Sequence, residues 1–156
     1  MALYASPGTD LVVGENTYQT YTYPGVVGTW MITNSKEGIY NRTTFPGKES
    51  GERGYYYTLE NAATACPSGW RVPTLEDWEK LKHYYYYAPE SLKAEEAARH
   101  EKGGLPQASP GSYGANWDVA SYYASTDTSI IFQFWGGYGQ RALGSGNVVS
   151  VRCIKE

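Results

Sequence analysis

The segment at residues 54–78, GYYYTLENAATACPSGWRVPTLEDW, constrains the fold more than any other part of the chain. It predicts two short helices joined by an aromatic turn. Thr58 suits the N-cap of the first helix, because its hydroxyl can accept a hydrogen bond from an otherwise unpaired backbone N–H. The apolar residues that follow have helical spacing: Leu59, Ala62, Ala63 and Cys66. Pro67 ends this helix, because the residue before a proline is pushed out of the α region.

The second helix begins after a turn at Gly69, which permits backbone angles that other residues resist. Thr74 is the expected N-cap, and acidic side chains favour the positive first turn of a helix. The two acidic residues in that turn are Glu76 and Asp77. Its buried stripe is predicted to be Leu75, Trp78 and Leu81.

The remaining sequence predicts strands around these helices. Strands are expected at residues 11–13, 17–23 and 26–33, and again at residues 122–126, 130–135 and 148–154. Residues 34–53 are polar and rich in Gly, and we expect a long loop there. Residues 88–102 have high helix propensity with a narrow apolar side, which predicts a surface helix. A chain of 156 residues can bury one core, so we expect a single α+β domain over residues 1–156.

Tyrosine is unusually frequent: the chain has 16 Tyr, against 5 Trp and 3 Phe. A core alone favours Phe, Leu and Ile, because their burial leaves no hydroxyl to satisfy. Tyrosine suits contact surfaces, since it combines a large rigid area with one polar group. We therefore favour a contact surface, the alternative being tyrosines that line turns and half-buried strands. Residues 84–87 are all Tyr, so some of them must be exposed.

Charge and motifs exclude several function classes. The net charge is −3, so a nucleic-acid-binding face is not expected. No segment approaches the roughly 20 apolar residues of a membrane helix, and no signal peptide is recognisable. His83 and His100 lie among charged residues on predicted helices, and we interpret them as solvated. No hydrolase elbow, phosphate loop or metal-ligand spacing occurs, so we expect no enzyme, metal or cofactor.

The strand predicted at residues 130–135 is apolar on both faces. Alternation places one set of side chains together: Ile130, Phe132 and Phe134. The opposite face carries Ile131, Gln133 and Trp135. If one face covers the core, the other is an exposed apolar patch, which usually marks an interaction site. The alternative is a strand buried on both sides.

Three blocks of sequence resemble a known family. Residues 66–74 read CPSGWRVPT and are followed by Glu76 and Trp78, residues 28–31 read GTWM, and residues 150–153 read SVRC. These blocks resemble the signature of the Fibrobacter succinogenes major paralogous domain. The resemblance implies a C-type lectin-like fold, with a twisted antiparallel sheet, two helices and long loops.

The same resemblance implies a disulfide between Cys66 and Cys153, because these positions are neighbours in the lectin-like fold. The alternative is two buried free thiols that pack as small apolar groups. A bridge that closes so long a loop stabilises a fold by roughly 4 kcal/mol in the loop-entropy model.

Residues 112–141 resemble the variable region of proteins that retroelements diversify. They are dominated by Tyr, Ser, Ala, Gly, Ile and other small or polar residues. The resemblance implies a ligand-binding surface, in which aromatic residues anchor the contact and polar residues adapt. The candidate ligand-binding residues are Tyr113, Asn116, Asp118, Tyr122, Thr128, Ser129, Ile131, Gln133, Trp135 and Tyr138.

Calcium-dependent sugar binding is not expected, because the chain lacks the Glu-Pro-Asn or Gln-Pro-Asp tripeptide of calcium-binding lectins. We therefore expect calcium-independent binding of a macromolecule, namely a protein on a cell or particle surface. The location would be extracellular, on a cell surface or on a virion. The alternatives are a structural subunit of a surface or viral particle, and carbohydrate binding without calcium.

Overall fold

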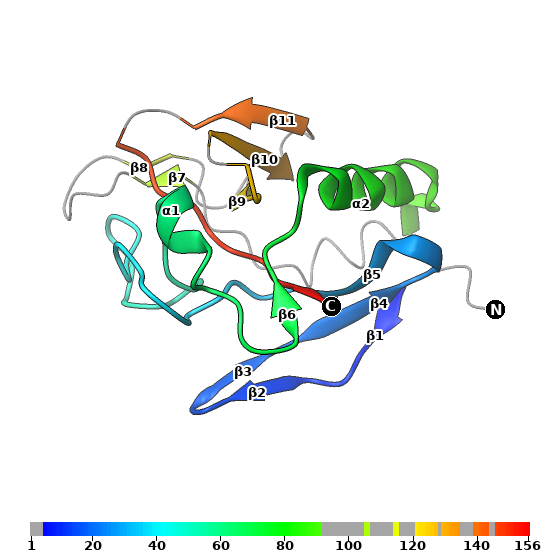
Figure 1. The fold of residues 1–156 in the computed structure, drawn as a ribbon, viewed down its shortest axis with the longest axis horizontal. Helices are drawn as coiled ribbons and strands as arrows, with labels where there is room; N and C mark the ends of the chain where they lie inside the picture. Colours follow the sequence, from blue (N-terminus) through cyan, green and yellow to red (C-terminus); the bar gives the residue numbers. More distant parts are fainter. Residues whose placement is uncertain are drawn as a thin grey trace.

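The computed structural model describes residues 5–91, 105–106, 114–115, 121–127, 129–134, 139–143 and 146–156. These residues form a mixed α+β structure with antiparallel sheets and two α-helices (Figure 1). The α+β class expected from the sequence is thereby confirmed. The helix predicted at residues 88–102 lies outside the described residues from residue 92 onward.

The larger sheet brings distant parts of the chain together. Its strand order is β1 (Ser6–Pro7), β4 (Thr20–Tyr23), β5 (Gly28–Met31), β12 (Ile154–Lys155) and β6 (Trp70–Arg71). Ile154 pairs with Trp30 on one side and with Arg71 on the other. The C-terminal strand therefore closes the sheet between two strands from the first half of the chain. A separate hairpin joins β2 (Leu11–Val13) to β3 (Asn16–Tyr18).

Three of the predicted strands are interrupted or shortened. The strand expected at residues 17–23 divides at Gln19, because β3 pairs with β2 whereas β4 pairs with β1 and β5. The strand expected at residues 26–33 begins instead with a 3-10 turn, η1 (Gly25–Val27). At residues 148–154 only the last residue belongs to a regular strand, while Val149 and Ser150 form isolated bridges.

A smaller sheet has the order β11 (Gly139–Ala142), β10 (Ile130–Phe134) and β9 (Ser121–Ala124), all antiparallel. Tyr123 bridges to Ser150, and the Ala124 N–H donates to the Ser150 carbonyl at 3.1 Å. This bridge joins the small sheet to the C-terminal segment. A further short pair links β7 (Leu105–Pro106) to β8 (Gly114–Ala115).

Helix α2 (Leu75–Tyr87) starts where the sequence predicts. The Thr74 hydroxyl accepts from the Asp77 N–H at 3.0 Å, and the Asp77 carboxylate accepts from the Thr74 N–H at 2.8 Å. This reciprocal pair is a capping box, in which two N–H groups at the helix start are satisfied. Trp78 and Leu81 are buried as expected, Leu75 is half-buried, and Tyr85 extends the buried stripe by one turn.

Helix α1 (Leu59–Ala62) is shorter than expected. Thr58 caps it as predicted, accepting from the Asn61 N–H at 3.2 Å. The helix ends well before Pro67, because the chain tightens: the Thr64 and Ala65 N–H groups bond three residues back instead of four. The Thr64 hydroxyl also accepts from the Ile39 N–H at 2.7 Å, a contact from the long loop that local sequence does not reveal.

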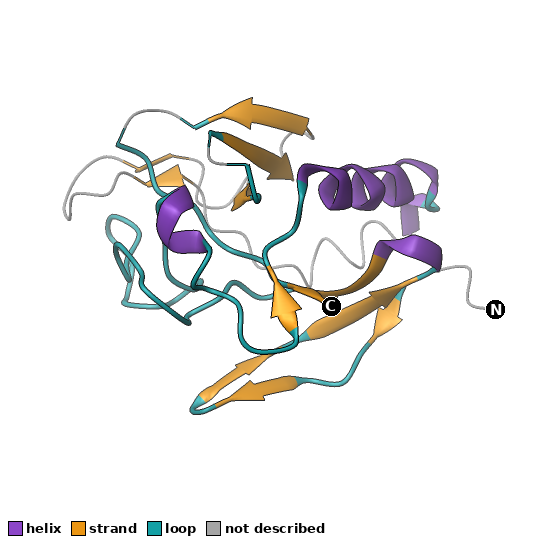
Figure 2. Cartoon of the chain, viewed as in Figure 1, coloured by secondary structure: helices purple, strands orange, loops and turns teal. Residues whose placement is uncertain are grey.

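The long loop between β5 and α1 is drawn without helices or strands (Figure 2). It is fixed at Asn34, whose side chain donates to the Arg53 carbonyl at 2.9 Å and accepts from Arg152 Nε at 2.7 Å. Gly54 has a φ of 80°, and a Cβ there would lie 2.5 Å from the Asn34 Cβ. This close approach requires glycine, so the two ends of the loop lie tightly against each other, and Arg152 ties them to the C-terminal segment.

Cys66 and Cys153 form a disulfide with a Cα–Cα distance of 5.7 Å. It links the turn after α1 to the residue just before β12. The pairing implied by the family resemblance is therefore present in the structure. No helix among the described residues is long and apolar enough to cross a lipid bilayer.

Candidate functional site

The register of the small sheet brings several predicted site residues onto one face. Gln133 on β10 lies opposite Tyr122 on β9, and Ile131 lies opposite Arg141 on β11. Since side chains alternate along a strand, these residues share one face. The opposite face carries Tyr123, Phe132 and Phe134, which pack against α2. We call the first face, defined by Tyr122, Ile131, Gln133 and Arg141, the outer face.

Burial divides the outer face into two parts. Tyr122 is 2% exposed and Ile131 is fully buried. Both pack in a core cluster that includes Tyr57, Val149 and residues near them. The expectation that Tyr122 and Ile131 present exposed side chains to a ligand is therefore wrong. The small sheet is covered on both sides, because the segments around residues 57 and 149–151 cross the outer face while α2 covers the opposite one.

The remaining part of the outer face is accessible. Arg141 is exposed and Gln133 is half-buried. Arg141 Nη1 donates to Gln133 Oε1 at 3.0 Å, and the guanidinium carbon lies 5.3 Å from the centroid of the Tyr122 ring. This distance is within the range of a cation–π contact. The Arg141 guanidinium thus lies over the ring of the buried Tyr122 and is held in place by its hydrogen bond to Gln133.

Arg141 was not among the predicted site residues. A sequence signal for it exists, because it is the only basic residue within residues 112–141. The composition of that region drew attention to tyrosines and small polar residues instead. The register of β11 places Arg141 opposite Ile131, and its side-chain contacts place it over Tyr122 and beside Gln133.

Ser129 lies at the opposite end of β10, in the turn after β9. The Asp127 Oδ1 atom accepts from the Ser129 N–H at 2.8 Å, from the Ser129 hydroxyl at 3.0 Å and from the Ile130 N–H at 3.1 Å. These hydrogen bonds hold the pKa of Asp127 below its ordinary value, and the bond from the Ser129 backbone N–H has the largest effect. Ser129 is exposed, but its hydroxyl is engaged in shaping the turn.

Six predicted site residues lie outside the described residues: Tyr113, Asn116, Asp118, Thr128, Trp135 and Tyr138. His100 lies outside them as well. His83 is an exposed residue of α2 whose ring lies 4.7 Å from that of Tyr87. Within the tyrosine run, Tyr85 is buried while Tyr86 and Tyr87 are 74% and 70% exposed, so the prediction of exposed tyrosines there is confirmed.

A polar hollow lies beside the β2–β3 hairpin. It is lined by Glu15, Asn16, Thr17, Tyr18, Thr33, Asn34 and Lys36. The Tyr18 hydroxyl donates to the Glu37 carboxylate and accepts from the Lys36 N–H at 2.9 Å. Burial first, and then Glu37, raises the pKa of Tyr18 well above its ordinary value. Tyr18 is therefore a neutral structural hydrogen-bond donor and not an acid available for chemistry.

The described residues contain no cluster of three or more His, Cys, Asp or Glu side chains that could hold a metal ion.

Tyr57, like Tyr18, has a pKa raised mainly by burial, and its hydroxyl donates to the Glu37 carbonyl at 2.5 Å. The polar groups of this region are thus committed to structural hydrogen bonds.

The segment at residues 66–78 packs against the small sheet on the face opposite the outer face. Trp78 lies 4.9 Å from the Tyr123 ring and 5.6 Å from the Phe132 ring, stacked on both, and its Nε1 donates to the Ala124 carbonyl at 3.2 Å. The Thr126 N–H donates to the Pro73 carbonyl at 3.0 Å. These contacts fix β9 and β10 relative to α2.

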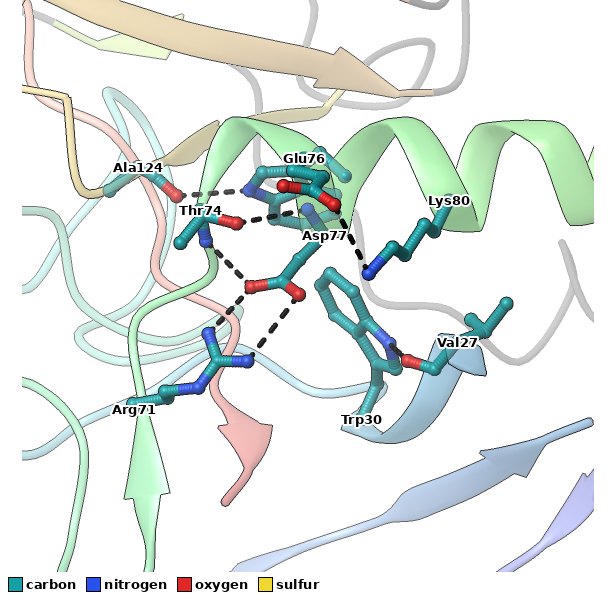
Figure 3. A network of polar contacts seen from close by, with 9 residues as sticks. Val27, Trp30, Arg71, Thr74, Glu76, Asp77, Lys80 and Ala124 are labelled. Carbon is teal, nitrogen blue, oxygen red and sulfur yellow. Dashed lines mark hydrogen bonds and ion pairs between the residues drawn. The ribbon is translucent and has the colours of Figure 1, made fainter. Parts of the chain in front are cut away.

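A salt bridge at the start of α2 completes this support. Figure 3 shows Arg71 reaching the Asp77 carboxylate, with Nη1 to Oδ2 at 2.5 Å, beside the capping box with Thr74. Burial acts to raise the pKa of Asp77, but the hydrogen bonds from Arg71 and Thr74 outweigh it and hold that pKa below its ordinary value. The conspicuous motif of the sequence is therefore a structural support and contributes no free reactive group.

Comparison with known proteins identifies the family of the chain. The family model of the Fibrobacter succinogenes major domain matches residues 14–138, which is most of the chain. No curated protein and no solved structure matches the chain. The matched span contains the supporting segment at residues 66–78 and the tryptophans Trp30 and Trp78, and it includes β9 and β10.

Proposed function

We propose that this chain, which belongs to the Fibrobacter succinogenes major domain family, binds a macromolecular ligand without calcium and is not an enzyme. The ligand would be a protein on a cell or particle surface, and residues 112–141 would form the contact. The observation that carries the proposal is the exposed Arg141, hydrogen-bonded to the half-buried Gln133 on a sheet whose other face is fixed by Trp78. A rigid support beneath adaptable polar groups is suited to recognition.

We assign the chain to the C-type lectin-like fold. The assignment is supported by β12, which returns between β5 and β6, and by the disulfide that ties it to the first helix region. Two helices and a long loop complete the pattern. A disulfide persists in oxidising surroundings, which favours a location outside the cell, on a cell surface or on a virion.

Residues 112–141 would be the part that a retroelement diversifies. Their composition supports this, and so does the accessible end of the outer face, where side chains can change without altering the core. The gene provides the test: a near-copy repeat with adenines at the substituted positions, beside a reverse-transcriptase gene, is expected. A set of close relatives with substitutions spread evenly over the chain contradicts it.

Binding can be tested with fluorescently labelled protein on a panel of bacterial and eukaryotic cells and on a glycan array. The variant Trp135→Ala/Tyr138→Ala/Arg141→Ala is expected to lose cell binding while keeping the melting temperature of the wild type. Tyr122→Ala is unsuitable for this purpose, because Tyr122 is a core residue. Equal cell binding by this variant and the wild type contradicts the proposed surface.

Calcium independence is tested in the same assay by adding a chelator. We expect neither cell binding nor the melting temperature to change, since the chain lacks the calcium tripeptides of lectins. A large rise in melting temperature on adding calcium contradicts this part of the proposal. Binding confined to the glycan array would favour the carbohydrate alternative instead.

A structural or assembly role is the second candidate. It is favoured by exposed large apolar or aromatic side chains among the described residues, since such side chains are frequent at contact surfaces. They are Val12, Val26, Ile39, Tyr40, Tyr86 and Tyr87. Sedimentation distinguishes the two functions, because an assembly subunit forms a tight homo-oligomer and a ligand-binding module remains monomeric.

A further inference from the structure

Arg141 is an exposed cation whose charge is not neutralised within the described part of the protein. The ion pairs there join Arg71 to Asp77 and two lysines to glutamates on α2, and Arg141 takes part in none of them. Among the described residues it contacts Gln133 through a hydrogen bond and Tyr122 through the ring. A neutral amide and a neutral ring fix the guanidinium in place without cancelling its charge.

This fixation prepares Arg141 for a particular kind of partner. A guanidinium has five N–H donors in a planar fork, and the contact with Gln133 uses one of its nitrogens, Nη1. The remaining donors can meet the two oxygens of a carboxylate side by side, a geometry that a lysine cannot reproduce. Because Gln133 and Tyr122 already hold the side chain, little rotamer entropy remains to be lost on binding.

The position of Arg141 suits a protein partner. It lies on β11, at the edge of the small sheet. Of the hollows lined by described residues, the one beside Tyr18 and the narrow one beside Trp30 do not include Arg141. Small ligands are usually held in concave pockets, whereas protein partners dock on open surfaces.

The charges within residues 112–141 make this cation informative. Arg141 is the only basic residue of that region, which also contains two acidic residues, Asp118 and Asp127. Within this region a carboxylate of a partner is therefore favoured at Arg141. Such a cation selects the position of the partner's acidic residue more than it accelerates the encounter.

We propose that Arg141 binds an aspartate or glutamate side chain of the protein ligand, and that Gln133 is the positioning residue that holds the guanidinium for it. This inference rests on the proposed binding function and names the chemistry of its partner at that site. It goes beyond the aromatic contact surface expected from the sequence.

A random-peptide library selected on the intact chain tests the inference, because the selection does not require the ligand to be identified first. Peptides recovered on the wild type are expected to be enriched in Asp or Glu. Affinities of one recovered peptide are then measured for the wild type and for Arg141→Gln, Arg141→Lys, Gln133→Ala and Lys155→Gln. Lys155 is an exposed residue of β12, so its variant removes the same charge from a different surface.

Arg141→Gln is expected to weaken binding roughly 10- to 100-fold, because it removes charge-assisted hydrogen bonds. Arg141→Lys keeps the charge but not the fork, and we expect an intermediate loss. Gln133→Ala is expected to weaken binding several-fold only while Arg141 is present, and Lys155→Gln about twofold at most. Replacing the acidic residue of the peptide by its amide should cost nothing further in Arg141→Gln.

Several results overturn the inference. Peptides that lack an acidic residue, or that bind wild type and Arg141→Gln equally, remove the assigned partner while leaving the binding function intact. Binding of an acidic glycan that is lost in Arg141→Gln replaces the protein carboxylate by a sugar carboxylate. Recovery of no peptide, together with no binding to any cell, counts against the binding function itself and this assignment with it. Each variant must keep the melting temperature of the wild type. If Gln133→Ala does not, Gln133→Glu provides a second test, because it places a negative charge beside the Arg141 guanidinium.

Discussion

Trp78 and Arg141 lie against opposite faces of the same three-stranded sheet, and they differ in almost every physical respect. Trp78 is buried and stacks on Tyr123 and Phe132, with its N–H bonded to the Ala124 carbonyl. Arg141 is exposed and rests on Tyr122. The face against Trp78 and the part of the outer face around Tyr122 and Ile131 belong to the core, whereas the accessible end of the outer face at Arg141 can vary without disturbing it.

This difference separates the part of the family signature that holds the fold from the exposed side chains that the proposed binding would use. The matched motif at residues 66–78 supplies a disulfide, a helix cap and a buried indole, all of which hold the sheet in place. None of these groups is free to contact a partner. Three residues of β11, Gln140, Arg141 and Ala142, are exposed, so substitutions there should disturb the core little.

The largest effect is expected at Trp78. Trp78→Ala should lower the free energy of unfolding by about 3 to 5 kcal/mol, because it removes a fully buried indole and leaves a cavity. Trp78→Phe retains a stacking ring but loses the hydrogen bond to Ala124, and a loss of about 1 to 2 kcal/mol is expected. Urea unfolding measures both, and a loss below about 1 kcal/mol for the alanine variant contradicts the supporting role.

Removal of the disulfide should have the next largest effect. The variant Cys66→Ala/Cys153→Ala is expected to lose about 2 to 4 kcal/mol, since the unfolded chain gains the freedom of a long loop. The wild type in reducing buffer should unfold at the same urea concentration as the variant. If reduction leaves the unfolding midpoint unchanged, the bridge does not stabilise this fold.

A smaller, pH-dependent effect is expected at Asp77. Its pKa in the folded protein is below the ordinary value, so its stabilising contribution is present above about pH 4 and is lost as the pH falls further. The Arg71 side chain is 40% exposed, which limits the salt bridge through solvent screening. Asp77→Asn should therefore cost only about 1 kcal/mol at neutral pH.

When urea unfolding is repeated at successively lower pH below about 4, the difference between wild type and Asp77→Asn should shrink as the pH falls through the lowered pKa of Asp77. Glu76→Gln is the matched control, because Glu76 is in the same turn with a side chain that is 79% exposed. It should change stability by less than about 0.5 kcal/mol. A difference for Asp77→Asn that is independent of pH shows that the charge of Asp77 is not what stabilises the helix start.

The smallest effect on stability is expected on the accessible part of the outer face. Arg141→Ala should change the free energy of unfolding by no more than about 0.5 kcal/mol, as is usual for exposed side chains. Thermal unfolding of this variant beside Trp78→Ala measures the contrast directly. If Arg141→Ala destabilises the protein as strongly as Trp78→Ala, the two faces do not have separate roles.

Local sequence predicted the start of α2 correctly, and the reason is that its determinants are near one another in the chain. Thr74 and Asp77 form the capping box within a single turn, and Trp78 and Leu81 follow at helical spacing. The length of α1 was predicted wrongly, because Thr64 bonds to Ile39 in the long loop. That partner is distant in sequence, so no local pattern reports it.

The candidate site divides in the same way. Alternation along β10 identified which residues share a face, and the register confirms that Ile131 and Gln133 do. It did not show that Tyr57 and Val149 cover Ile131 and Tyr122. Alternation also did not identify Arg141 as a site residue, because its hydrogen bond to Gln133 joins two different strands.

The sequence alone determined the family, the helix caps, the periodicity of the strands and the abundance of tyrosine. Each of these depends on composition or on short stretches of adjacent residues. Only the tertiary structure decided which tyrosines are core and that Arg141 is exposed beside Gln133, whereas the Cys66–Cys153 disulfide implied by the family resemblance is present in it. Burial depends on what crosses a strand from elsewhere in the chain, and side-chain alternation carries no information about that.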